Sequence, residues 1–326
     1  MRLFYLLLSV VILLVFSAPG CSSVEEGSGR LITLSNNSLK IILAPELGGR
    51  MVFFGHPDGA NLLKENEEVW QAHTWPDSVL LDMPFKGYQG MIIWLGPQSH
   101  WWIHQDLMPE RKAAKAVWPP DPYLIYGGFQ VVHLTDSSVI LSGPPSPVSG
   151  VVMKKEFWLK GNLLQLAVEI ENISNDTLGW DIWTNSRFDP ETSFYVPNID
   201  TATLGFTYNN ALGCAPISHS MENGGFSFKL PSVAANPDSI YQTKAFMYSS
   251  EGQIVVEQGN HRLIMSFTPP EKHEIHPEQA LIEVYMKMSA DESNNLLELE
   301  HHSAFQLLAP GEKMRTSQSW ILEALK

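Results

Sequence analysis

Trp183, Asn185 and Arg187 recur at every second position of one short, aromatic-rich stretch of the chain. In an extended strand, residues two apart point to the same face, so this spacing brings an indole, an amide and a guanidinium together. The indole offers a flat apolar ring, and the other two groups donate hydrogen bonds. We therefore predict that this strand carries part of a binding surface.

Two glutamates near the C-terminus show the same spacing. Glu298 and Glu300 lie in the segment 296–300, whose alternation of apolar and acidic residues is typical of a strand. Their carboxylates point to one face, so one or both could meet a ligand. The alternative is that they form an ordinary solvated strand face.

Tryptophan is frequent in this chain, with 10 in 326 residues. Sugar-binding surfaces use such rings to stack on pyranose rings, although most Trp residues of a β-sandwich belong to its core. Several of them, including Trp101 and Trp102, fall among Pro and Gly in the irregular segment 65–126. Because long loops on a rigid scaffold often carry binding surfaces, we expect one here.

Other motifs that could bind metals or cofactors are weak. His273 and His276 are three apart, and His301 and His302 follow Glu300, but neither pair has the His-Glu-x-x-His pattern of a metalloprotease helix. Gly-x-Ser-x-Gly, phosphate-binding Gly-rich loops and paired Cys ligands are missing from the sequence. We predict no metal and no cofactor.

Strands must position the candidate residues. Apolar residues alternate with a period of two, not 3.6, over 151–159 and 164–170, and a third strand pattern follows at 178–187. Further strand patterns flank these on both sides, interrupted by a short helix expected at 109–115 and a loop-rich stretch at 189–223. The sequence predicts an all-β fold built on a large antiparallel sheet.

Composition limits the classes of function. The formal net charge of −14 and the lack of clustered Lys and Arg argue against sequence-independent nucleic-acid binding. With 44% hydrophobic residues the chain is long enough for a substantial core, and no repeat or linker divides it. We predict one domain at 31–326, with Cys214 as a small buried apolar residue.

The first 21 residues have the features of an export signal. Arg2 gives a positive start, residues 3–16 are apolar, and Ser-Ala-Pro-Gly-Cys follows at 17–21. A Cys directly after small residues resembles the lipobox of bacterial lipoproteins. This resemblance implies cleavage before Cys21 and a diacylglycerol on its thiol. The alternative is an uncleaved N-terminal membrane anchor.

Residues 22–30 form a flexible tether by composition. Both alternatives for the N-terminus place the domain outside the cytoplasm. The resemblance to bacterial lipoproteins implies the bacterial cell envelope, and by that resemblance Ser22 after Cys21, instead of Asp, favours the outer membrane. The domain would then face the periplasm or the cell surface, bound to the membrane through its lipid.

The order and spacing of several motifs resemble the galactose mutarotase-like superfamily over residues 31–326. These motifs are Gly-Gly-Arg at 48–50, Glu-Asn-Ile-Ser at 171–174, Trp-Asp-Ile-Trp-Thr-Asn at 180–185, the Glu-bearing strand at 296–300, and Leu-Ala-Pro-Gly-Glu at 308–312 followed by Trp320. The resemblance implies a large antiparallel β-supersandwich with a sugar-binding groove on one face. Within the superfamily, the chain looks most like a bacterial branch known only as a domain of unknown function.

In catalytic members of this superfamily, a glutamate deprotonates the anomeric hydroxyl and a histidine protonates the ring oxygen. Glu298 or Glu300 matches the position of the base. The family's histidine is missing at 183–187, where Asn and Arg cannot donate a proton near neutral pH. His104 could replace it from the loop segment; the alternative is a structural histidine. Arg50 resembles an arginine that contacts sugar hydroxyls, or else is a surface charge in a turn.

Three hypotheses follow. The first is a carbohydrate-binding module without chemistry, favoured by the missing acid and the aromatic loops, whose partner is a mono- or oligosaccharide. Its expected binding residues are Arg50, Trp101, Trp102, Trp183, Asn185 and Arg187. The second is an aldose 1-epimerase-like isomerase with Glu298 or Glu300 as base and His104 as acid. The third is a structural envelope protein with an inactive groove.

Overall fold

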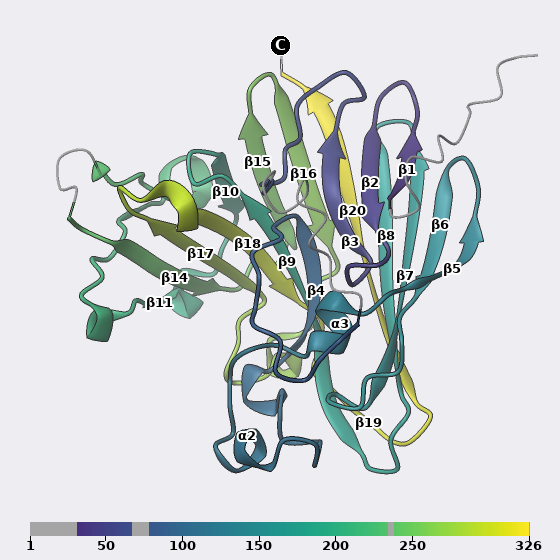
Figure 1. Ribbon diagram of the computed structural model, residues 1–326. Coiled ribbons are helices and arrows are strands. Elements are labelled where there is room, and N and C mark those ends of the chain that lie inside the picture. The colour runs from purple at the N-terminus through teal and green to yellow at the C-terminus, as the bar shows by residue number, and fades with distance from the viewer. Residues whose placement is uncertain (1–30, 67–77, 234–237, 326) are drawn as a thin grey trace, which may run out of the picture.

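The computed structural model describes residues 31–66, 78–233 and 238–325, and its strands form two antiparallel sheets (Figure 1). The predicted signal segment, Cys21 and the tether lie outside the described residues. The predicted all-β antiparallel fold is confirmed. Among the described residues, no helix combines the length and apolar character that crossing a membrane requires.

The first sheet contains the strands that bear the candidate residues. Its strands are β1 (Ile32–Ser35), β2 (Lys40–Ala44), β3 (Arg50–Gly55), β4 (Met91–Gly96), β9 (Leu178–Phe188), β11 (Gly205–Thr207), β14 (Tyr241–Met247), β17 (Ile282–Met288), β18 (Leu296–His302) and β19 (Gln306–Leu308). Their order is β1-β2-β3-β4-β9-β18-β17-β14-β11, with β19 paired to β9. The aromatic strand β9 therefore lies directly beside the glutamate strand β18.

The second sheet carries the long central hairpin. Its strands are β5 (Gln130–Leu134), β6 (Ser138–Ser142), β7 (Val151–Lys160), β8 (Leu163–Asn172), β10 (Ser193–Pro197), β12 (His219–Ser220), β13 (Gly225–Phe228), β15 (Gln253–Gln258), β16 (His261–Phe267) and β20 (Lys313–Ala324). Their order is β12-β13-β10-β15-β16-β20-β8-β7-β6-β5. At the β7–β8 turn, Gly161 takes a positive φ of 60°, which glycine adopts without a steric cost.

The two sheets pack face to face around one hydrophobic core. Phe54 of β3 meets Trp320 of β20 edge to face, with ring centroids 5.0 Å apart. Gln318 of β20 donates to the hydroxyl of Thr184 in β9 at 3.2 Å. These contacts come from alternate residues of each strand, so the other residues of the first sheet face outward.

Two segments differ from the sequence expectation. The stretch 189–223 contains β10, β11 and β12, which are two to five residues long and too short to show a period in the sequence. Besides the expected helix, α2 (Pro109–Ala113), there is α3 (Pro122–Tyr126), whose first N–H groups are capped by Asp121. In Figure 1, α3 lies beside β4, and α2 lies further down in the view. The predicted burial of Cys214 is confirmed.

Candidate functional site

The outer face of the first sheet collects charged side chains from adjacent strands. On β18, Leu297 and Leu299 belong to the core, so Glu298, Glu300 and His302 point to the outer face. The strand register sets Glu300 between Glu283 on β17 and Asn185 on β9. Each of these outward-facing groups is nevertheless buried.

Glu298 pairs with the predicted binding residue Arg187. Their Oε1 and Nη2 atoms are 2.8 Å apart, and both side chains are largely covered. Arg187 also donates from Nε to Oδ1 of Asn185 at 3.3 Å. The structure thus brings these three predicted residues together. The alternative of a solvated glutamate face is wrong for Glu298 and for Glu300.

Glu300 belongs to a second group centred on Lys244 of β14. The Nζ atom of Lys244 lies 2.5 Å from Oε2 of Glu283 and 3.1 Å from Oε2 of Glu300. The indole N–H of Trp183 also donates to Oε2 of Glu300, at 2.8 Å. One cation and one indole therefore hold two buried carboxyl groups.

These two carboxyl groups differ in acidity. Burial is the main cause that raises the pKa of Glu300; Lys244 opposes it, and the neighbouring carboxylates of Glu298 and Glu283 add to the rise. Burial alone would also raise the pKa of Glu283, but Lys244 and His302 more than offset it and lower this pKa. At neutral pH, Glu283 is thus the ionised member of the pair, and Glu300 holds a proton more readily.

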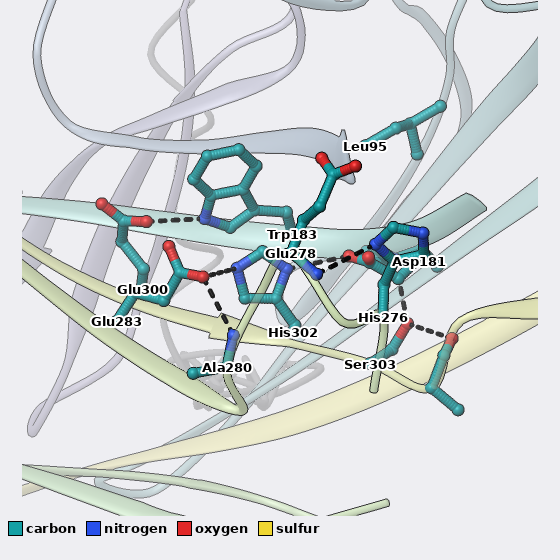
Figure 2. A network of polar contacts seen from close by, with 12 residues as sticks. Leu95, Asp181, Trp183, His276, Glu278, Ala280, Glu283, Glu300, His302 and Ser303 are labelled. Carbon is teal, nitrogen blue, oxygen red and sulfur yellow. Dashed lines mark hydrogen bonds and ion pairs between the residues drawn. The ribbon is translucent and has the colours of Figure 1, made fainter. Parts of the chain in front are cut away.

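His302 ends the row on β18 and lies between two carboxylates (Figure 2). Its Nδ1 is 2.9 Å from Oδ1 of Asp181, and its Nε2 is 3.4 Å from Oε1 of Glu283. Burial lowers the pKa of His302, but Asp181 and Glu283 outweigh this effect and raise it to about 9. Without a bound cation, His302 is charged at neutral pH.

The predicted aromatic residues pack against one another and are covered. Trp183 meets Trp94 edge to face at a centroid distance of 4.9 Å and lies nearly parallel to Trp101 at 6.1 Å. Trp102 is also buried, and its indole N–H donates to the carbonyl of Pro119. None of the three predicted Trp rings therefore offers an open face for stacking in the described part of the chain.

The other two predicted residues lie apart from the glutamates. His104 contacts His100 and Trp180, with ring centroids 5.6 and 5.2 Å away. Burial lowers the pKa of His104 to about 4, so it is neutral near pH 7 and has no readily donated proton. Arg50 is not a surface charge, because it is buried and donates to the carbonyl of Gln89 at 2.6 Å.

A groove of about 510 Å³ opens beside the charged residues, lined by residues from 203–207, 246–248 and 272–281. Phe206 is exposed at its mouth, and Phe246 is half-buried. Ala280 in its wall donates its backbone N–H to Oε1 of Glu283, which connects the groove to the charged residues (Figure 2). The volume is within the range of about 300–1,000 Å³ typical of small-molecule sites.

The sequence analysis did not predict Glu283, Asp181 or Lys244, and it named His302 only in a weak metal-binding motif. His302 continues the alternation of Glu298 and Glu300, so spacing alone could have placed it on their face. Asp181 could likewise have been placed two residues before Trp183. Glu283 and Lys244 could not, because their positions depend on the register between separate strands.

Comparison with known proteins agrees with this architecture. The model of a family described as "Domain of unknown function (DUF4380)" matches residues 30–323. The chain belongs to this family. No curated protein matches the chain.

Several solved structures, some of them with mutarotase-like names, are similar to this DUF4380 protein. A candidate aldose 1-epimerase from Escherichia coli K12 has a TM-score of 0.53 at 18% identity, with 90% of this chain and 99% of that chain covered. A galactose mutarotase related enzyme from Lactobacillus acidophilus has a TM-score of 0.51 at 9% identity, with 91% and 98% covered. The Slr1438 protein from Synechocystis reaches 0.56 at 11% identity, with 94% and 100% covered. These similarities confirm the galactose mutarotase-like sandwich predicted from the sequence.

Proposed function

We propose that this protein binds a carbohydrate in the groove beside β14 and β17. The observation that carries the proposal is the groove itself. Aromatic residues line it, and Ala280 in its wall donates a hydrogen bond to Glu283, one of the buried charged groups. Sugars present apolar ring faces and many hydroxyl groups, so they require both aromatic surfaces and polar atoms. Phe206, Phe246 and Tyr248 supply the first, and Lys272 and His276 supply the second.

Unpartnered polar atoms near the groove and on the same outer face support this proposal. Oδ2 of Asp181 and Nδ2 of Asn185 are buried without a hydrogen-bond partner, as is Oε1 of Gln279 in the groove wall. A buried polar atom without a partner costs free energy, which a bound ligand or water recovers. Because both donors and acceptors are left over, hydroxyl groups, which can both donate and accept, suit them.

The test is a glycan screen of the full-length chain, followed by calorimetry with any sugar that binds. We expect Phe246→Ala to weaken binding about tenfold, which corresponds to about 1.4 kcal/mol. Trp158→Ala is the matched control, because Trp158 is an exposed aromatic residue on the outer face of the second sheet. Binding that Phe246→Ala leaves intact, or the absence of any bound sugar, would refute the proposal.

A second candidate function is aldose 1-epimerase activity. The observation that favours it is that Glu298, Glu300 and His302 share one face, so a histidine does lie beside the predicted bases, although it is not His104. Against it, both glutamates are already paired, with Arg187 and with Lys244. Polarimetry of anomer exchange decides: activity requires faster mutarotation of some aldose, lost in Glu298→Gln or Glu300→Gln.

We also propose that the protein is a lipoprotein of the bacterial envelope, modified at Cys21. The support is the apolar segment followed by small residues and Cys21. Metabolic labelling with a clickable fatty acid should mark the protein, and Cys21→Ala should abolish the label. An unlabelled protein would refute lipidation at Cys21: if it retained residues 1–21, the uncleaved anchor would hold, and if it were cleaved, the segment would be another export signal.

A further inference from the structure

Two carboxyl groups and an imidazole converge where β17 and β18 pair. Glu283, Glu300 and His302 each offer one ligand atom, and these atoms all lie within 4.8 Å of one another. All three side chains are buried. Figure 2 shows His302 between Glu283 and Asp181, and Glu300 beside Glu283 with its carboxyl group at the indole of Trp183.

The atoms of this group divide into two sets. The Oε2 atoms of Glu283 and Glu300 are occupied, because both lie close to Lys244. In contrast, Oε1 of Glu300 and Nε2 of His302 are buried and have no hydrogen-bond partner. Oε1 of Glu283 lies 3.4 Å from that same Nε2. Lys244 thus neutralises part of the negative charge of the two glutamates through their Oε2 atoms, and leaves Oε1 of Glu300 and Nε2 of His302 unpaired.

Asp181 fixes the orientation of His302. Its Oδ1 atom is 2.9 Å from Nδ1, so a proton on Nδ1 leaves the lone pair of neutral His302 at Nε2, on the side of the glutamates. A carboxylate that holds the distal nitrogen of a histidine is the usual second partner of a metal-binding imidazole.

From this geometry we infer a binding site for a divalent transition-metal ion at Glu283, Glu300 and His302, oriented by Asp181. Two carboxylate oxygens and one imidazole nitrogen form a donor set that accepts Zn²⁺, Mn²⁺ or Fe²⁺. When ionised, the carboxylates of Glu283, Glu300 and Asp181 together balance the charges of the ion and of Lys244. Lys244 is the most exposed member of the group, at 21% of its side chain, whereas the three ligand side chains are almost fully covered. This site goes beyond carbohydrate binding.

The experiment uses the full-length chain without an affinity tag, treated with EDTA and dialysed. Titration with MnCl₂, followed by electron paramagnetic resonance, and with ZnCl₂, followed by calorimetry, should give one bound ion per chain and a higher Tm. His302→Gln and Glu300→Gln should each weaken binding at least a hundredfold. Asp181→Asn should weaken it by about 10- to 100-fold, the usual effect of losing such a partner.

Glu298→Gln is the matched control, because Glu298 lies on the same strand and face but pairs with Arg187. It should bind the ion within about threefold of the unchanged protein. Near-ultraviolet circular dichroism checks that each variant is folded, and Asp181→Asn keeps the test valid if a ligand variant unfolds. Failure of the folded protein to bind either ion at 1 mM overturns the site, as does equal binding by all variants. No sugar is present, so the result is independent of the proposed groove.

Discussion

Two segments of this protein are almost identical in pattern and opposite in environment. Residues 168–171 read Val-Glu-Ile-Glu on β8, and residues 297–300 read Leu-Glu-Leu-Glu on β18. On β8 the side chains of Glu169 and Glu171 are 24% and 40% exposed, whereas on β18 those of Glu298 and Glu300 are 11% and 1% exposed. Alternation therefore tells which face a residue occupies but not how deeply that face is covered.

The partners of the glutamates differ in the same way. On the second sheet, Lys313 lies 3.4 Å from Glu169 and 2.9 Å from Glu171, with half of its side chain in solvent. On the first sheet, Lys244 binds two carboxyl groups away from most solvent and lies over the ring of Trp183. Exposed ion pairs contribute little to stability, whereas burying charged groups costs desolvation free energy. Buried charges with shifted pKa values often mark functional sites, so the outer face of the first sheet is the better candidate for function.

The largest effect is expected when each sheet loses its lysine. Lys244→Met leaves Glu283 and Glu300 buried without their cation and should lower the free energy of unfolding by about 3–5 kcal/mol. Lys313→Met on the second sheet should leave it nearly unchanged, because the ion pairs of Lys313 are exposed. Urea denaturation followed by Trp fluorescence measures both. Equal losses would show that the two faces do not differ.

The arginines should show the same contrast at a smaller scale. Arg187→Met removes the partner of Glu298 and should cost about 2–3 kcal/mol, the range for a hydrogen bond to a buried charged group. Arg315→Met removes one of the two cationic partners of Glu156 on the second sheet. Because Lys154 remains 3.0 Å from Glu156 and Arg315 is itself 42% exposed, it should cost about 1 kcal/mol. The same urea denaturation compares them. A greater loss for Arg315→Met would reverse the assignment of the two faces.

What the sequence could predict follows the same division. The period of two in β7, β8 and β9 predicted their strands and put Trp183, Asn185 and Arg187 on one face, as observed. The pattern was sufficient because a strand fixes the direction of its own side chains. The same alternation predicts that Glu298 and Glu300 share one face of their strand.

Contacts between residues on different strands could not be predicted from the alternation within each strand. Glu283 meets Glu300 because of a register set between β17 and β18, which the pattern of neither strand specifies. The loop context of Trp101 predicts a surface that stacks on sugars. In the structure, however, Trp101 packs on Trp183 and is buried. Whether an indole binds a ligand or another indole depends on contacts between distant segments.

The Glu156–Arg315 pair of the second sheet should contribute to the loss of stability in acid. Hydrogen bonds from Arg315 lower the pKa of Glu156 from 4.5 to about 2. Since the pKa in the folded state is below that in the unfolded state, this stabilisation is complete above about pH 5 and is lost as the pH falls from about 4.5 to about 2. Glu156→Gln should therefore lose stability less steeply between pH 5 and pH 3, measured by urea denaturation. Identical slopes would contradict this role for the Glu156–Arg315 pair.

The smallest expected effect is that of salt. Mobile ions screen exposed charge pairs, and at 1 M salt the screening length falls to about 3 Å, while buried pairs are screened much less. In 1 M NaCl, Lys313→Met and the unchanged protein should converge in stability, since the pairs of Lys313 with Glu169 and Glu171 are already weakened. The loss in free energy of unfolding caused by Lys244→Met should persist, because the carboxylates of Glu283 and Glu300 are buried and are not in contact with the added ions. If salt removed the stability losses of both lysine variants equally, the charges on the two faces would be equally screened. The outer face of the first sheet would then have no distinct electrostatic environment.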